Sequence, residues 1–136
     1  MSGGPWERER REWRLAKDAS SLRSARQNVA SVVKGAVDPK TLQDLLVIAN
    51  ELVTNAIRHG EAFEDGTVVL SVDVLERSVK VAVADAGLGF DRSASKLQAR
   101  GATGGFGLSL VDRLSDGWGV SPGGNKAVWA ERHRHA

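Results

Sequence analysis

The segment from Pro39 to His59 constrains the fold more than any other part of the chain. Its hydrophobic residues recur at steps of three and four, the period of a helix that buries one face. Asp38 before the proline is a typical helix start, and Gly60 is a typical helix stop. The sequence therefore predicts one long amphipathic helix that must pack against a second layer.

A polar pattern runs along the same segment. Glu51, Asn55 and His59 are spaced by four residues, so their side chains share one stripe of the predicted helix. Asn is a poor helix former, and its place inside a helix needs a reason. A carboxylate and an amide on one stripe fit the wall of an active site, although the spacing alone is equally compatible with an ordinary solvated face.

The rest of the chain alternates between strand and helix patterns. Further helices are expected after Ser20 and after Leu108. Strands are expected where hydrophobic and polar residues alternate, near residues 13–17, 67–75, 79–83, 117–120 and 127–130. The last four strands run without long crossovers. The sequence therefore predicts an α+β fold, a two-layer sandwich of a mixed, mainly antiparallel sheet with helices on one face.

Length, charge and cysteine content limit the classes of protein. A chain of 136 residues favours one domain, and we expect a disordered leader at 1–11, a folded domain at 12–132 and a tail at 133–136. The net charge of +2 comes from mixed signs and does not indicate direct nucleic-acid binding. The chain has no cysteine, no membrane-length apolar run and no secretion leader. We therefore expect a cytoplasmic protein.

Two glycine-rich stretches follow the long helix. Asp85 precedes Gly87 and Gly89, and glycine lets a backbone approach a ligand closely. A carboxylate there can accept a hydrogen bond from an amino group such as that of adenine. Residues 104–107 open a helix, whose free N–H groups and dipole suit phosphate. Each signal is weak alone, since such an Asp is usually a turn residue and such a cluster a flexible loop.

The order and distances of these motifs resemble those of a known family. The motifs are Glu-Leu-Val-Thr-Asn-Ala-Ile-Arg-His-Gly (51–60), Asp-Ala-Gly-Leu-Gly (85–89) and Gly-Gly-Phe-Gly-Leu-Ser-Leu-Val-Asp (104–112). Together they resemble the Bergerat ATP-binding fold of gyrase, histidine kinases and MutL. Within that superfamily they look like the anti-sigma-factor serine kinases. The resemblance covers residues 13–132, nearly the whole chain.

The resemblance implies an ATP-dependent serine/threonine protein kinase that uses ATP and Mg²⁺. Such a kinase binds a sigma factor and phosphorylates a small antagonist protein, and the family often forms homodimers. By position, Glu51 would be the catalytic general base, and Asn55 would bind Mg²⁺ through its side-chain carbonyl. Asp85 would accept a hydrogen bond from the adenine amine, and Gly87 would give the base room.

The remaining site residues also follow from the resemblance. Residues 91–103 would form a lid over ATP that starts at Gly89. Further residues expected at the nucleotide are Arg58, His59, Arg92, Lys96, Arg100, Gly104, Gly105, Phe106, Gly107 and Leu108. The chain departs from the family pattern at two places. Ala127 stands where a threonine would bring a hydroxyl near adenine, and Asp91-Arg92 stands where a proline is common.

Three other functions would use the same groups. A catalytically silent, nucleotide-gated binding module would sequester a partner without phosphoryl transfer. The presence of Glu51 argues against this module, and the departure at Ala127 argues mildly for it. A detached histidine-kinase-type ATPase domain is disfavoured, because no helical pair with a phospho-accepting histidine precedes residue 38. Plain ATP hydrolysis would need only water as the acceptor.

Overall fold

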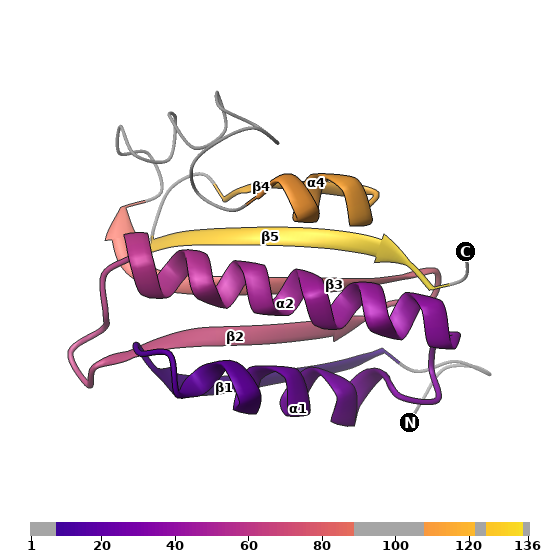
Figure 1. Ribbon diagram of the computed structural model, residues 1–136, viewed down its shortest axis with the longest axis horizontal. Coiled ribbons are helices and arrows are strands. Elements are labelled where there is room, and N and C mark those ends of the chain that lie inside the picture. Colours follow the sequence, from indigo (N-terminus) through magenta and orange to yellow (C-terminus); the bar gives the residue numbers. More distant parts are fainter. Residues whose placement is uncertain (1–7, 89–107, 122–124, 135–136) are drawn as a thin grey trace.

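Helices and strands form two layers in the computed structural model, which describes residues 8–88, 108–121 and 125–134. In chain order the elements are β1 (Glu9–Ala16), α1 (Ser21–Val33), α2 (Pro39–His59), β2 (Thr67–Val74), β3 (Ser78–Leu88), α4 (Ser109–Leu114), β4 (Gly117–Val120) and β5 (Asn125–His133). Figure 1 shows the helices side by side on one face of the sheet. The expected two-layer α+β sandwich is confirmed.

The sheet has the strand order β1-β2-β3-β5-β4, and every pairing between these described strands is antiparallel. Val81 lies opposite Val72 on one side and Ala130 on the other. The register between β3 and β5 becomes irregular between Ala84 and Leu88. This irregular stretch contains Asp85, so the change in backbone course falls at the second motif.

Three strands extend further than the sequence predicts. The first begins at Glu9, so residues 9–11 belong to the sheet rather than to a disordered leader. Strand β3 continues through Asp85 to Leu88 instead of ending near residue 83, and β5 continues to His133. The sequence obscures these ends because charged residues and glycines there interrupt the alternation of hydrophobic side chains.

The core lies between the sheet and the helices, and α2 contributes its centre. Leu45, Ile48 and Leu52 project from α2 and are fully buried. They pack with buried strand residues such as Leu70 and Val81 in one hydrophobic cluster. Each of these side chains stabilises the fold by about 1.5–3 kcal/mol through burial. This packing fixes the position of α2, and therefore of its polar stripe, relative to β3.

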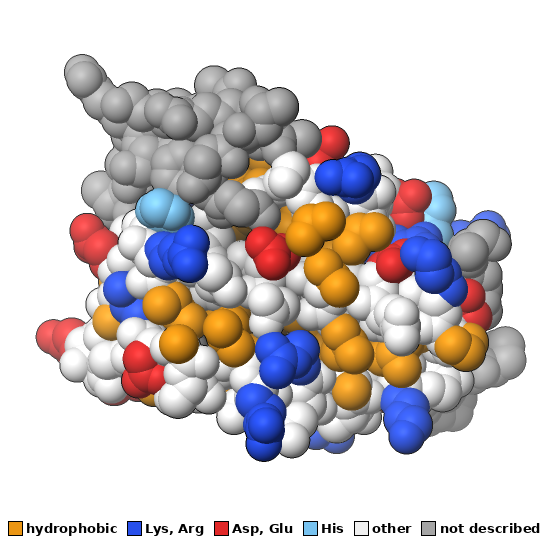
Figure 2. All heavy atoms as spheres, viewed as in Figure 1, with side chains coloured by type: hydrophobic (Ala, Val, Ile, Leu, Met, Phe, Trp, Pro, Cys, Tyr) orange, Lys and Arg blue, Asp and Glu red, His pale blue; other side chains and the backbone are white. Residues whose placement is uncertain are grey.

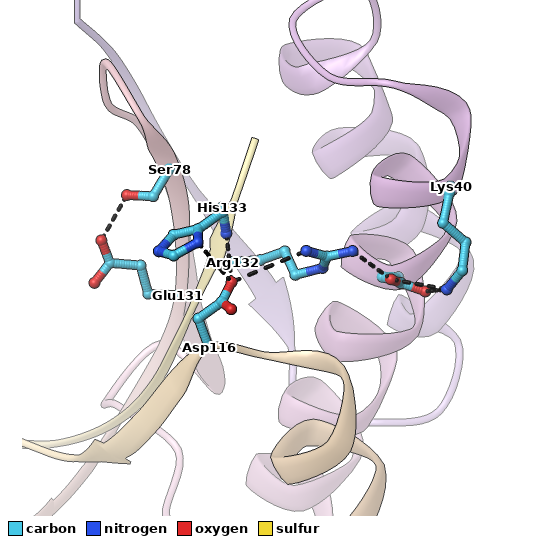
Figure 3. A network of polar contacts seen from close by, with 7 residues as sticks. Lys40, Ser78, Asp116, Glu131, Arg132 and His133 are labelled. Atoms are coloured by element: carbon cyan, nitrogen blue, oxygen red, sulfur yellow. Dashed lines mark hydrogen bonds and ion pairs between the residues drawn. The ribbon is translucent and has the colours of Figure 1, made fainter. Parts of the chain in front are cut away.

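An ion-pair network ties the first half of α2 to the end of β5. The buried carboxylate of Asp44 accepts hydrogen bonds from Lys40 Nζ at 2.8 Å and Arg132 Nη2 at 2.9 Å. Figure 3 shows Arg132 reaching across from the strand, with Asp116 on its other side at 3.9 Å. Burial opposes ionisation of Asp44, but the hydrogen bonds and charges of Lys40 and Arg132 outweigh it and lower its pKa.

The two faces of the molecule differ in character. Figure 2 shows the helix-covered face, where hydrophobic side chains gather in patches between charged ones, and Val47 and Leu110 are the exposed large hydrophobic residues described. The opposite face of the sheet carries a hollow of about 240 Å³ beside Trp129. Among the described helices, none is both long and apolar enough to cross a membrane.

Candidate functional site

The polar stripe of α2 places an amide inside the protein. Asn55 is 3% exposed, and its side-chain oxygen Oδ1 is buried without a hydrogen-bond partner among the residues that the structure describes. Glu51 precedes it by four residues on the same helix face and is half-buried. A carboxylate and an amide oxygen are therefore held next to each other by a helix that the core keeps rigid.

The buried oxygen of Asn55 has a chemical consequence. A buried acceptor without a partner costs about 1–3 kcal/mol, so such an atom is uncommon unless something binds to it. Mg²⁺ prefers oxygen ligands and keeps several of its waters when it binds to protein. An amide oxygen that lacks a partner in the described chain therefore fits the single protein ligand that Mg·ATP would need. The described residues contain no cluster of three or more His, Cys, Asp or Glu side chains suited to a metal.

Asp85 provides the second buried polar group of the site. It is 2% exposed and lies on the face of β3 that carries the buried residues Val81 and Val83, so its carboxylate points into the helix layer. Its Oδ1 atom accepts a hydrogen bond of 2.7 Å from the backbone N–H of Gly87. The sequence predicts Asp85 at the end of a strand, whereas it lies inside β3 and is held by the irregular backbone that follows.

Gly60 joins α2 to this carboxylate. A β-carbon at this position would lie 2.5 Å from Asp85 Oδ2 and 2.7 Å from the carbonyl oxygen of Ala56. The φ of Gly60 is −90°, which any residue adopts, so the glycine is not a left-handed helix cap. The close approach of the Asp85 carboxylate explains why residue 60 is a glycine. Just beyond, the N–H of Ala86 donates a 2.7 Å hydrogen bond to the carbonyl of Glu61, which holds the two segments together.

Lys126 is a site residue that the sequence does not single out. Its Nζ atom lies 3.8 Å from Asp85 Oδ2 although its side chain is only 6% exposed. A buried lysine is rare without a partner. The sequence signal for its burial is its place in β5, where residues 126, 128 and 130 form the buried face of the strand. The same alternation puts Ala127 on the opposite face, beside the hollow near Trp129. The expected place of residue 127 near adenine stays a prediction.

The end of α2 brings two exposed side chains near this pair. Arg58 and His59 are both exposed on the last turn of the helix. Partial burial lowers the pKa of His59, and the positive charges of Lys126 and Arg58 lower it further. The side chains of Arg58 and His59 lie exposed at the end of α2, and their contact with a nucleotide stays a prediction.

Several expected site residues lie outside the described part of the chain: Gly89, Arg92, Lys96, Arg100, Gly104, Gly105, Phe106 and Gly107. Leu108 is described, and it immediately precedes α4. Its side chain is fully buried and belongs to the hydrophobic core. Any contact of Leu108 with a nucleotide would therefore involve its backbone. From the list of expected residues, Glu51 and Asn55 share one face of α2, and Asp85 lies beside Gly60 at the end of that helix, with Lys126 next to it.

This fold and these buried groups define a class of protein. Residues 15–129 match the family model described as a histidine kinase-like ATPase domain, and the chain belongs to this family. The Bergerat ATP-binding fold expected from the motifs is thereby confirmed. No curated protein matches the chain by sequence.

A solved structure has a similar fold. It is the crystal structure of the RsbU and RsbW domains of Rv1364c from Mycobacterium tuberculosis, with a TM-score of 0.66 and 19% sequence identity. The match covers 92% of this chain and 32% of that chain, so the present chain spans about a third of its length. At this identity the similarity shows a shared fold.

Proposed function

We propose that this chain is an ATP-dependent regulatory serine/threonine protein kinase that binds a sigma factor and phosphorylates a small antagonist protein. The observation that carries the proposal is the buried Oδ1 atom of Asn55, which lacks a hydrogen-bond partner in the described chain and lies one helical turn from Glu51. Membership of the histidine kinase-like ATPase domain family supports ATP as the nucleotide that the chain binds. The motifs of residues 51–60 and 104–112 support the narrower assignment.

Each described group has a defined part in phosphoryl transfer. Asp85 would hold the exocyclic amine of adenine, and Asn55 would hold Mg²⁺ through Oδ1. Bound Mg²⁺ would neutralise charge on the phosphates. Glu51 would accept the proton of the antagonist's hydroxyl as that oxygen bonds to the γ-phosphorus and the bond from phosphorus to ADP breaks. Because this reaction depends mainly on positioning and charge, a rigid helix carrying the amide and the base is a suitable framework.

The partners follow from similarity rather than from a surface of this molecule. The similar crystal structure contains the RsbU and RsbW domains of Rv1364c, and the motifs here resemble those of the anti-sigma-factor kinases. A sigma factor and a small antagonist protein are therefore the partners to test first. A binding module without catalysis would share the same nucleotide site and would differ only in failing to transfer phosphate.

The experiment is a labelling assay on native partners. The chain would be used to capture proteins from its own cells, and the complex would be incubated with Mg²⁺ and ATP labelled at the γ-phosphate. Label on serine or threonine of a captured small protein supports kinase activity. Loss of that labelling in Glu51→Gln supports the role of Glu51 as the general base. Glu76→Gln, at an exposed carboxylate in the turn between β2 and β3, is the matched control. Capture of a partner that never acquires label would contradict kinase activity.

A further inference from the structure

We infer that Lys126 reads the nucleotide base together with Asp85, donating a hydrogen bond to ring nitrogen N1 of adenine while the carboxylate accepts one from the exocyclic amine. The inference rests on the proposed function, because it requires a nucleotide at Asp85. It adds a specificity-determining residue that the motifs do not mark, since Lys126 lies outside all three of them.

The first observation is the buried pairing itself. Lys126 and Asp85 have side-chain exposures of 6% and 3%, and Nζ and Oδ2 are 3.8 Å apart. That distance is too long for a hydrogen bond, although it allows attraction between the charges. Among the described residues, no acceptor is hydrogen-bonded to the Lys126 ammonium group. The group has three N–H donors, so it retains donors for a ligand at the site.

The second observation concerns the carboxylate. Oδ1 of Asp85 already accepts the N–H of Gly87, and Oδ2 lies against Gly60 and faces Lys126. Each carboxylate oxygen can accept more than one hydrogen bond, so Asp85 can still accept one from a ligand. The site therefore presents an acceptor and a donor side by side in a region that the core shields from water.

This pair of groups matches one edge of adenine. Adenine carries an amine donor and, on the adjacent ring atom, the acceptor N1. Guanine and hypoxanthine carry an acceptor oxygen and an N–H donor at these same two positions, so the order is reversed. In the orientation that serves adenine, the oxygen of those bases would face Asp85 and their N–H would face Lys126. Such mispaired buried groups are a source of specificity.

A purely structural role for Lys126 gives a different expectation. A buried carboxylate is costly without a compensating charge, and the lysine could serve only to neutralise Asp85. Removing a neutralising lysine would change the affinity for all adenine nucleotides by the same factor. Removing a base-reading lysine would also abolish the dependence of affinity on N1.

The experiment is calorimetry with two nucleotides on the full chain. The probes are Mg·ATP and Mg·1-deaza-ATP, in which a C–H group replaces N1. We expect the parent to bind the deaza analogue about tenfold or more weakly, the loss of one charge-assisted hydrogen bond. Lys126→Met should bind the two nucleotides within about twofold of each other, because it cannot use N1. Lys126→Gln retains an N–H donor without the charge and should keep part of the preference.

Lys80→Met is the matched control. Lys80 belongs to β3 of the same sheet but lies on the opposite face, with Nζ 5.0 Å from the centre of the Trp129 ring. It should retain the parental ratio between the two nucleotides. Equal affinity of the parent for both nucleotides, or an unchanged ratio in Lys126→Met, would overturn the role of Lys126 and leave the kinase proposal intact. Failure of the parent to bind Mg·ATP would instead overturn the proposed function itself, and the inference with it.

Discussion

A β-carbon on Gly60 would lie 2.5 Å from Oδ2 of Asp85, so the end of α2 and strand β3 meet only because residue 60 has no side chain. The same contact places Asp85 beside the helix that carries Glu51 and Asn55. The second and first motifs are thus joined through a glycine that belongs to the first. The geometry therefore holds a buried carboxylate at the end of the helix that carries the buried amide.

Gly60→Ala should lower the free energy of unfolding by about 1–3 kcal/mol, because the added methyl group forces backbone or carboxylate to move. Affinity for ATP should fall as well, since the atom displaced is Asp85 Oδ2. Denaturant unfolding and calorimetry measure the two effects. At Gly117 a β-carbon meets nothing within 4 Å, so Gly117→Ala should change stability by no more than about 0.5 kcal/mol. Equal tolerance of both substitutions would contradict the close approach.

Glu51→Gln should separate nucleotide binding from phosphoryl transfer. The variant keeps the shape of the side chain but cannot take a proton, so its rate of transfer should fall by about 10²–10⁴-fold. Its affinity for Mg·ATP should stay close to that of the parent, since Asn55 and Asp85 are unchanged. A single-turnover assay with labelled ATP provides the rate. Transfer at the parental rate would remove Glu51 from the role of base.

Asp44 should make stability depend on acid pH. Its pKa lies below the ordinary value of 3.8 in the folded protein, because its hydrogen bonds to Lys40 and Arg132 outweigh the effect of burial. The stabilisation is therefore complete above pH 3.8 and is lost as the pH falls through the lower, folded-state pKa. Asp44→Asn should cost about 3 kcal/mol at neutral pH, because it leaves Arg132 without its buried partner.

The difference in stability between the parent and Asp44→Asn should then shrink in strong acid, where the parent's Asp44 is protonated. Chemical denaturation at a series of pH values measures it. Glu12→Gln is the control, because Glu12 pairs with Arg10 at the surface, where such pairs contribute about 0–1 kcal/mol. A difference that stays constant from neutral pH to strong acid would contradict the assigned pKa direction.

The long helix could be predicted from sequence almost to the residue. Asp38, Pro39 and Gly60 mark its ends, and the observed helix runs from Pro39 to His59. Its hydrophobic period also identifies the buried face. The reason for Gly60 could not be predicted, because the atom that it approaches belongs to Asp85, a residue distant in sequence.

Lys126 shows what a local pattern cannot supply. A lysine between an asparagine and an alanine is expected to be solvated, and its burial follows only from the register of β5 against β3. That register also decides which face Ala127 occupies. By contrast, Asn55 could be singled out from sequence, since an asparagine inside a strongly amphipathic helix contradicts the local propensity.

The most direct test of the account is calorimetric titration of Asn55→Ala with ATP in the presence and absence of Mg²⁺. The parent should bind ATP more tightly with Mg²⁺, and the variant should lose this Mg²⁺-dependent binding while remaining folded, because the buried Oδ1 has no partner in the described chain to lose. Asn50→Ala, at the amide on the same helix that pairs with Arg26, should bind Mg·ATP like the parent. Undiminished affinity of Asn55→Ala for Mg·ATP would contradict the central claim that this amide oxygen holds the metal.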